Sequence, residues 1–304
     1  EIGIASRGAR LGFDPLGLLA ITHQGCYVVL NDNTWIDLLD KKAAGAKVQQ
    51  VIFDAEGRAY YGAFGSWGLM EFTTDGLLMP ESLLPKSYPP WVLASTFTNL
   101  VPTAHGVFFA SFNGVVYWDR RTHEHTFFEV PQMPRIFTIN DDVFVWSHRI
   151  GIQRLDLASG SLQAVTGIDY GSHIVDQMTA LDAGHVLVST FAGGLLVFDG
   201  SQLTPWSGPL TGRVARRVSA LQRLVDGNVA VAISGRGLYI ASPTGEILSS
   251  FTSVEYHRII ELATREAGVL WVETETGVEK VLYDSALTSF GQRVGLPISW
   301  PQVA

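Results

Sequence analysis

The stretch from Arg258 to Phe290, RIIELA-TREAG-VLWVET-ETG-VEKVLY-DSALTSF, decides the fold of this chain. Its short apolar segments are separated by two turns that end in glycine, at Gly268 and Gly277. Val, Leu and Trp follow the first of these glycines, and β-branched and aromatic residues after a turn favour a strand. No stripe of apolar residues at helical spacing fits the stretch. We therefore predict a small antiparallel sheet of short strands joined by tight turns.

The same unit recurs along the whole sequence. The glycines assigned to its second turn are Gly25, Gly68, Gly114, Gly151, Gly194, Gly237 and Gly277. A period of roughly 40 residues, repeated over the chain, is typical of a β-propeller, in which each unit forms one blade. The pattern predicts an all-β, seven-bladed β-propeller of four-stranded antiparallel blades, as a single domain over residues 1–304. The predicted blades are 9–40, 48–80, 97–130, 135–165, 176–206, 217–251 and 258–290, with 291–304 as a tail or a linker to a following domain.

The second strand of each unit is a nearly continuous apolar run, as in VFFASF, VFVW, VLVS, VAVAI and VLWV. A strand with one exposed face would alternate apolar and polar residues instead. Both faces of these strands are therefore expected to be covered. Blades stacked face to face provide such cover.

Composition and net charge limit the classes of molecule that this chain is expected to bind. Hydrophobic residues make up 47% of the 304-residue chain and charged residues 16%, which suits a compact domain. The net charge of -8 argues against nucleic acid as a partner and against contact with an anionic membrane. The only cysteine, Cys26, lies in the apolar run CYVVL, and we expect it to be a buried core residue.

Motifs for catalysis, cofactor binding and metal binding are absent from the sequence: there is no GxSxG, HExxH, P-loop or CxxC. We therefore expect no enzymatic activity, no cofactor and no metal. The nearest approach to a metal site is His123 and His125, which would share one face of a strand. A zinc site needs further ligands, so solvated side chains are the favoured interpretation of this pair.

Two stretches interrupt the repeat. The segment 79–95, MPESLLPKSYPPWVLAS, is longer than a hairpin loop and holds four prolines. Long excursions of this kind are often functional. The segment 212–224, GRVARRVSALQRL, is interpreted as a loop or short helical turn over 212–217 that runs into the innermost strand of the sixth blade.

The run REAGVLWVETETGVEKV, followed by FGQRVGLP, resembles the two-component-regulator propeller repeat. DGNVAVAISGRGLYIASPTGEI and DAGHVLVSTFAGGLLVFDG look like further copies. The resemblance implies the extracytoplasmic sensor region of a bacterial signalling receptor, often a hybrid histidine kinase. It therefore implies a periplasmic or extracellular location and further domains of the same receptor chain as partners. Many receptors of this family respond to glycans.

The ligand site is expected where loops of several blades meet. In a four-stranded blade, the turn after the second strand and the segments that link blades lie at one end. The candidate ligand-binding residues at that end are Trp67, Trp91, His148, Arg149, Tyr170, His173, Arg213, Arg216, Arg217, Arg236, Tyr256, His257 and Arg258. Arginine offers forked donors to carboxylate or sulfate, and aromatic rings stack on sugars. Two other interpretations stay open: that the arginines are simply solvated, and that aromatics such as Trp67 pack between blades.

Three functional hypotheses result. The first is a non-catalytic sensor that binds a small molecule or an oligosaccharide, including an anionic one. The second is a protein interaction platform that docks a partner or a second copy in a homodimer. The third, with least support, is a glycoside hydrolase or polysaccharide lyase, because paired carboxylates are scarce in the loops. Tyr256, with His257 or His173 as base, leaves the lyase open.

Overall fold

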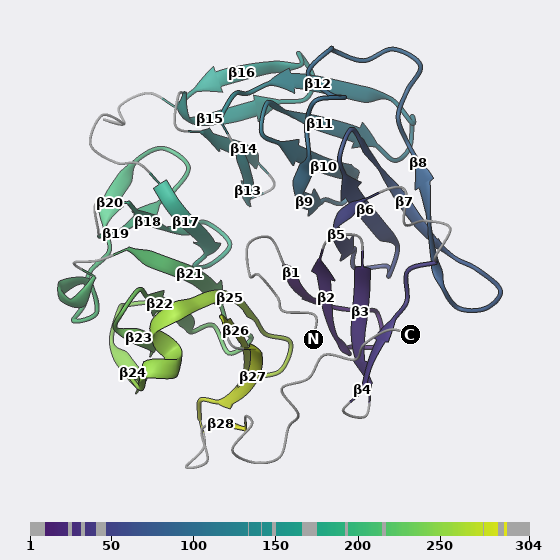
Figure 1. Ribbon diagram of the computed structural model, residues 1–304. Helices are drawn as coiled ribbons and strands as arrows, with labels where there is room; N and C mark the ends of the chain where they lie inside the picture. The colour runs from purple at the N-terminus through teal and green to yellow at the C-terminus, as the bar shows by residue number, and fades with distance from the viewer. Residues whose placement is uncertain are drawn as a thin grey trace. The chain divides into compact units, whose positions relative to one another are not determined.

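The computed structural model describes residues 10–23, 26–31, 34–40, 47–132, 134–140, 142–147, 150–165, 175–191, 194–214, 217–275, 277–284 and 289–290. Their strands form seven four-stranded antiparallel sheets, each with its strands in chain order (Figure 1). The predicted seven-bladed β-propeller is therefore confirmed. The described residues divide into two compact units, residues 10–164 and residues 165–290, here called the N-terminal and C-terminal units.

The N-terminal unit contains blades 1 to 4. Blade 1 is β1 (Arg10–Phe13), β2 (Leu19–His23), β3 (Cys26–Asn31) and β4 (Thr34–Asp37). Blade 2 is β5 (Val48–Phe53), β6 (Ala59–Ala63), β7 (Ser66–Phe72) and β8 (Leu78–Ser82). Blade 3 is β9 (Phe97–Pro102), β10 (Gly106–Ser111), β11 (Gly114–Asp119) and β12 (His125–Glu129). Blade 4 is β13 (Arg135–Ile139), β14 (Asp142–Ser147), β15 (Gly151–Asp156) and β16 (Ser161–Ala164).

The C-terminal unit contains blades 5 to 7. Blade 5 is β17 (Val175–Ala180), β18 (Val186–Thr190), β19 (Leu195–Phe198) and β20 (Leu203–Pro205). Blade 6 is β21 (Val218–Arg223), β22 (Val229–Ile233), β23 (Gly237–Ala241) and β24 (Ile247–Phe251). Blade 7 is β25 (Ile259–Ala263), β26 (Val269–Thr274), β27 (Gly277–Leu282) and β28 (Ser289–Phe290). Two 3-10 turns, η2 (Thr211–Arg213) and η3 (Val254–Arg258), lie in the segments that link these blades. The turn η2, followed by β21, agrees with the interpretation of 212–224.

Each pair of neighbouring blades within a unit shares one hydrophobic cluster. Strand β10 shows how this works: Val107 and Phe109 pack toward blade 2, whereas Phe108 and Ala110 pack toward blade 4. All six residues of β10 are buried. The continuous apolar runs of the second strands therefore reflect cover on both faces, as predicted.

Side chains of the innermost strands also join neighbouring blades. The side-chain oxygens of Gln50, Asn99 and Thr179 accept hydrogen bonds from backbone N–H groups of the next blade's innermost strand, at 3.0–3.2 Å. These N–H groups lie on a strand edge, where an unsatisfied donor costs free energy. Polar side chains of the innermost strands thus provide acceptors for backbone N–H groups at the sheet edges.

Five innermost strands carry a register shift against their second strand near their first residues. The unpaired residues at these bulges are Gln49, Thr98, Asp176, Ser219 and Ile260. A bulge changes the direction of a side chain and is common beside functional sites. In these five blades the bulge lies at the end where the linking segment enters.

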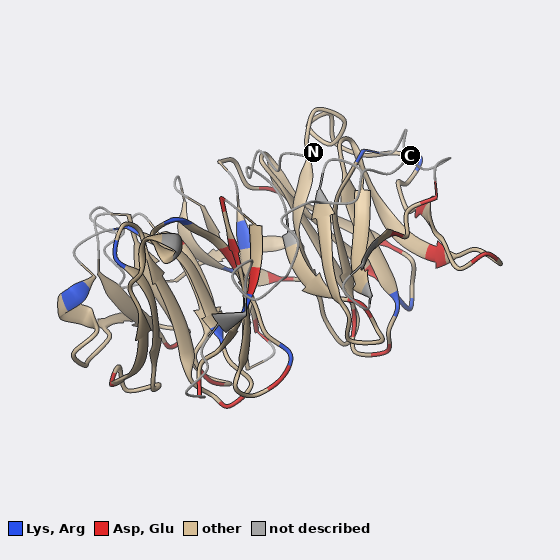
Figure 2. Cartoon of the chain, turned by 60° about the horizontal axis from the view of Figure 1, so that its bottom comes forward, with Lys and Arg blue, Asp and Glu red and all other residues tan. Residues whose placement is uncertain are grey.

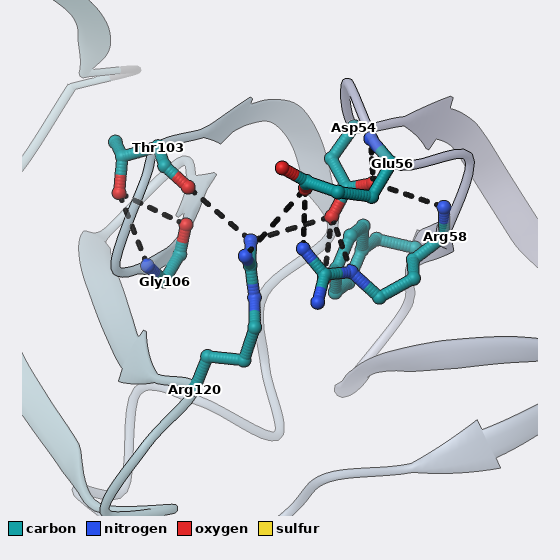
Figure 3. A network of polar contacts seen from close by, with 7 residues as sticks. Asp54, Glu56, Arg58, Thr103, Gly106 and Arg120 are labelled. Atoms are coloured by element: carbon teal, nitrogen blue, oxygen red, sulfur yellow. Dashed lines mark hydrogen bonds and ion pairs between the residues drawn. The ribbon is translucent and has the colours of Figure 1, made fainter.

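The opposite end holds the turns between first and second strands, and aspartates close them. Asp14, Asp54, Asp182 and Asp226 each accept at least one backbone N–H of their own turn. Asp54 also binds Arg58 and Tyr60 in its own blade and Arg120 of blade 3 (Figure 3). Arg120 donates in turn to the carbonyl oxygen of Thr103 (3.2 Å). This network connects blades 2 and 3.

The prediction that Cys26 is buried was wrong. Cys26 is exposed, and it is the first residue of β3. Along β3 the buried residues are Tyr27 and Val29, whereas Val28 and Leu30 are only partly buried. The strand therefore alternates in burial although its sequence does not alternate in polarity, and Cys26 is on the more open face.

We expect a thiol reagent such as a maleimide to modify Cys26 in the folded protein, with a stoichiometry of one. Partial burial and the nearby charge of Asp37 raise the pKa of the thiol above its ordinary value. The rate should therefore be lower than that of a free cysteine at neutral pH and should rise with pH, because the thiolate is the nucleophile. Mass spectrometry of the native protein measures this. Modification only after denaturation would contradict the exposed position.

Within the described residues, no helix has the length and apolar character to cross a membrane. The strands carry few charged residues, and Figure 2 shows Lys, Arg, Asp and Glu mostly near strand ends and turns. Recognition by charge is therefore expected at the loops.

Candidate ligand-binding site

We call one end of each blade the linker end: it holds the turn between the second and third strands and the segments that link blades. The sequence predicts that all thirteen candidate site residues lie at this end. His148, Arg149, Tyr170, His173 and Arg216 lie outside the described residues. Trp67 and Trp91 belong to the N-terminal unit, and the remaining six belong to the C-terminal unit.

Trp67 is the second residue of β7 and is fully buried. Its ring packs on Phe97 at a centroid distance of 4.8 Å and on Phe109 at 6.1 Å. Trp67 therefore packs between blades 2 and 3 and is not available to a ligand. We remove it from the candidate ligand site. Trp91, in the excursion 79–95, is partly buried, and its ring lies against Phe97 and Phe127 at 6.4 Å.

Arg217 forms more side-chain hydrogen bonds than any other predicted arginine among the described residues. It precedes β21 and forms two hydrogen bonds with Asp176, from Nε (2.7 Å) and from an Nη atom (2.9 Å). The Asp176 side chain is 8% exposed and that of Arg217 is 55% exposed. The hydrogen bond to Asp176 raises the pKa of Arg217. The guanidinium carbon lies 5.5 Å from the ring centroid of Phe191, a cation–π contact.

The segment η3 places three further predicted residues. Tyr256 is buried against Phe251, so its ring is not available for stacking on a ligand. His257 is partly exposed and donates from Nε2 to the carbonyl oxygen of Thr252 (3.3 Å). Arg258 is exposed and pairs with Glu275 in the β26–β27 turn at 2.6 Å.

Backbone hydrogen bonds hold these segments together. The N–H of Ser234, in the β22–β23 turn, donates to the carbonyl oxygen of Arg217 (3.0 Å). The N–H of Gly235 donates to the carbonyl oxygen of His257 (2.9 Å). Arg236 follows directly and is exposed. The structure therefore brings together the backbones at Arg217, Arg236 and His257, from three different segments.

Arg213 and Arg236 are exposed and form no ion pair with any residue that the structure describes. Arg213 ends η2, and Arg236 lies in the β22–β23 turn. Unpaired arginines at loops attract anions, because the local potential matters more than the net charge of the chain. We call the group Arg213, Arg217, Arg236, Arg258 and Phe191 the arginine rim.

The sequence analysis missed the exposed phenylalanines of the linker end. Phe64, Phe112 and Phe191 each follow directly after a second strand, and they are 57%, 54% and 58% exposed. Aligning the units on their second strands would have placed all three at one repeat position. Each presents an apolar ring at the end where loops gather.

The N-terminal unit also contains a hollow of about 350 Å³ at its linker end. Its lining includes Thr96, Thr98, Asn99, Phe112, Asn113 and Arg135. Five of these residues come from β9, β13 and the β10–β11 turn, and Thr96 lies between the excursion 79–95 and β9. None of them was a predicted site residue.

Metal binding finds no support among the described residues, which contain no group of three His, Cys, Asp or Glu side chains suited to an ion. The sequence predicts that His123 and His125 are both solvated. His123 is exposed in a turn, as expected, whereas His125 is partly buried and stacks on Phe127. Burial lowers the pKa of His125.

No protein-family model and no curated protein matches the sequence. The resemblance to the two-component-regulator repeat therefore stays a prediction at the level of the family. Solved structures do match, and they define the class of protein as a β-propeller.

One match is the extracellular domain of BT4673 from B. thetaiotaomicron, assigned to the hybrid two component systems. Its TM-score is 0.68 at 13% identity, over 93% of this chain and 39% of that one. This chain thus spans about two fifths of that domain. The designed protein Ika8 matches with a TM-score of 0.67 at 15% identity, over 92% of this chain and 85% of that one. The WD40 propeller domain of Doa1 matches with a TM-score of 0.66 at 12% identity, over 91% of this chain and 92% of that one. At these identities the likeness shows the fold.

Proposed function

We propose that this chain is the ligand-sensing propeller of a bacterial signalling receptor, that it acts in the periplasm or outside the cell, and that its ligand is an anionic oligosaccharide. The arginine rim carries the proposal. Asp176 orients Arg217 with two hydrogen bonds, so that less conformational freedom is lost when a ligand binds. Within the part of the chain that the structure describes, these bonds occupy two of the five N–H donors of the guanidinium and leave three for ligand oxygens.

The ring of Phe191 adds an apolar surface beside this cation. Sugars expose both hydroxyl groups and apolar C–H faces, so an arginine beside an aromatic ring matches both. Arg213 and Arg236 supply further positive charge, which favours acidic substituents. The extracellular domain of BT4673 supports the sensor assignment by its fold, and further receptor domains are part of the proposal.

A binding role without catalysis fits the two carboxylates that pair with arginines of the rim. Asp176 and Glu275 are each paired with an arginine. Both oxygens of Asp176 and one oxygen of Glu275 accept hydrogen bonds from an arginine, whereas a glycosidase uses two carboxyl groups directed at the bond to be cleaved. This arrangement favours binding over hydrolysis.

Removal of one rim arginine should weaken binding of an acidic oligosaccharide by roughly 1.5–3 kcal/mol if the contact is desolvated. The variants are Arg213→Ala, Arg217→Ala and Arg236→Ala, each titrated calorimetrically beside the parent chain. Arg265→Ala is the matched control, because Arg265 is exposed in the β25–β26 turn at the opposite end of blade 7. Unchanged affinity in all three rim variants, for an oligosaccharide that the parent binds, would place the site elsewhere.

The interaction platform has one observation in its favour. Phe64 and Leu93 are both exposed, and the backbone carbonyl of Leu93 lies beside Gly65. Exposed apolar side chains close together are typical of protein interfaces. A pure platform would leave acidic oligosaccharides unbound by the parent chain, so the same titration separates the two functions.

A further inference from the structure

The hollow of the N-terminal unit has polar groups that can donate hydrogen bonds. Asn99 Oδ1 accepts the backbone N–H of Ile136 (3.2 Å), which fixes the orientation of the amide. The amide nitrogen then has no hydrogen-bond partner among the described residues. The hydroxyl groups of Thr96 and Thr98 likewise have none there. A ligand that enters the hollow meets an NH2 group and two hydroxyl groups, all of which can donate.

Among the described residues that line the hollow, the only ionisable side chain is that of Arg135, at the start of β13, and none is an aspartate or a glutamate. A lining of donors with one guanidinium and no carboxylate favours an acceptor-rich anion over a cation or a neutral donor.

The backbone around the hollow also fixes the positions of the residues that line it. Thr98 is the unpaired residue of the bulge in β9, where the register against β10 shifts between Ala110 and Ser111. A bulge turns a side chain out of the regular alternation of the strand. The β10–β11 turn is held by one local hydrogen bond, from Asn113 N–H to Ser111 Oγ (3.3 Å). A second hydrogen bond, from Asn113 Nδ2 to Ser95 Oγ (3.0 Å), joins the turn to the segment before β9.

The hollow also has an apolar side. Phe112, 54% exposed, lines it together with Pro134 and two alanines. A ligand of suitable size therefore needs an apolar face or ring beside its anionic group.

We infer that this hollow binds a single carboxylate carried on a small body with an apolar face. The carboxylate accepts from Arg135, Thr98 and the Asn99 amide, and the body packs on Phe112. A uronic acid residue and the C-terminal carboxylate of a peptide share this chemistry. The site lies in the N-terminal unit and is independent of the arginine rim, which lies in the C-terminal unit.

The test pairs each carboxylate with its neutral counterpart: glucuronate against glucose, and N-acetyl-Ala-Ala against its C-terminal amide. Calorimetric titration and saturation-transfer NMR measure binding to the parent chain. At least one carboxylate should bind about tenfold or more tightly than its counterpart, since charge-assisted hydrogen bonds contribute about 1.5–3 kcal/mol and 1.4 kcal/mol is tenfold. Which pair shows the difference identifies the source of the carboxylate.

Three variants locate the binding. Arg135→Gln removes the charge, Thr98→Val removes one hydroxyl at nearly constant volume, and Phe112→Ala removes the ring. Each should weaken the bound carboxylate, Arg135→Gln by about tenfold or more. Phe64→Ala is the matched control, because Phe64 has the same repeat position and exposure but does not line the hollow.

Circular dichroism checks that each variant folds, and Thr98→Val keeps the test decisive if Arg135→Gln does not fold. The inference is overturned if neither carboxylate exceeds its neutral counterpart. It is also overturned if the folded variants bind as the parent does, or if Phe64→Ala has the same effect as Phe112→Ala.

Discussion

Replacing Trp67 by alanine should lower the free energy of unfolding by about 3–5 kcal/mol, as is typical for a fully buried large aromatic side chain. Trp67 lies in the cluster shared by blades 2 and 3, among Phe97, Phe109 and Val116. The deletion leaves a cavity between two rigid sheets, which can close it only in part.

Equilibrium unfolding in urea, followed by circular dichroism, measures the effect. If the two units unfold in separate transitions, the loss should be confined to that of the N-terminal unit. Trp67→Phe should cost clearly less, because it keeps most of the packing and removes a buried indole N–H that has no partner among the described residues. Phe64→Ala, at an exposed position three residues away, is the control. A loss below about 1 kcal/mol in Trp67→Ala would contradict the core position.

The error on Trp67 has an identifiable cause. An alignment of the repeats on their glycines makes Gly68 the turn glycine of blade 2. The turn is instead Phe64–Gly65, since Ala63 pairs with Ser66 and Gly65 has a positive φ of 65°. Gly68 lies inside β7, where a Cβ would stand 1.9 Å from the carbonyl oxygen of Glu81. A glycine required by close approach of two strands was thus interpreted as a glycine required by a turn.

The blades themselves were predictable because their signal is local. A buried second strand such as VFFASF is apolar at nearly every position. In blades 1, 2, 5 and 6 an aspartate also closes the turn before the second strand. The partners of charged residues are not local. Arg217 and Asp176 are 41 positions apart, and no pattern in the sequence indicates that one holds the other.

The hollow was missed for a related reason. Thr98 and Asn99 look like ordinary polar positions of a first strand, and only the register shift against β10 distinguishes them. The amide oxygen of Asn99 is occupied by a hydrogen bond from Ile136 of the next blade, a contact that the sequence does not reveal. Sites of this kind are made by packing between repeats, so the sequence of one repeat does not show them.

Replacing Asp54 by asparagine should lower the free energy of unfolding by about 2–3 kcal/mol at neutral pH. The side chain is 4% exposed. It accepts from Arg58 Nε (2.7 Å) and the Tyr60 hydroxyl (3.0 Å), and it pairs with Arg120 of blade 3 (3.3 Å). Asparagine keeps one oxygen for the backbone of the turn but loses the charge and directs an NH2 group at other donors.

Asp75→Asn is the matched control: Asp75 is exposed in the β7–β8 turn of the same blade. Its substitution should change the free energy of unfolding by no more than about 0.5 kcal/mol. Equal losses in the two variants would mean that the contacts of Asp54 with Arg58, Tyr60 and Arg120 do not stabilise the fold.

The effect of Asp54→Asn should also depend on pH. Burial alone would raise the pKa of Asp54, but hydrogen bonds from Arg58 and Tyr60 and the charge of Arg58 hold it below its ordinary value. A carboxyl group with a lowered folded pKa stabilises the protein above its unfolded pKa of about 3.9, and this contribution is lost as the pH falls through the folded value. Urea unfolding at neutral pH and at successively lower pH should therefore show the parent and Asp54→Asn converging on acidification. A difference that stays constant across this range would mean that Asp54 stabilises the fold by shape alone, and that its ion pairs with Arg58 and Arg120 contribute nothing.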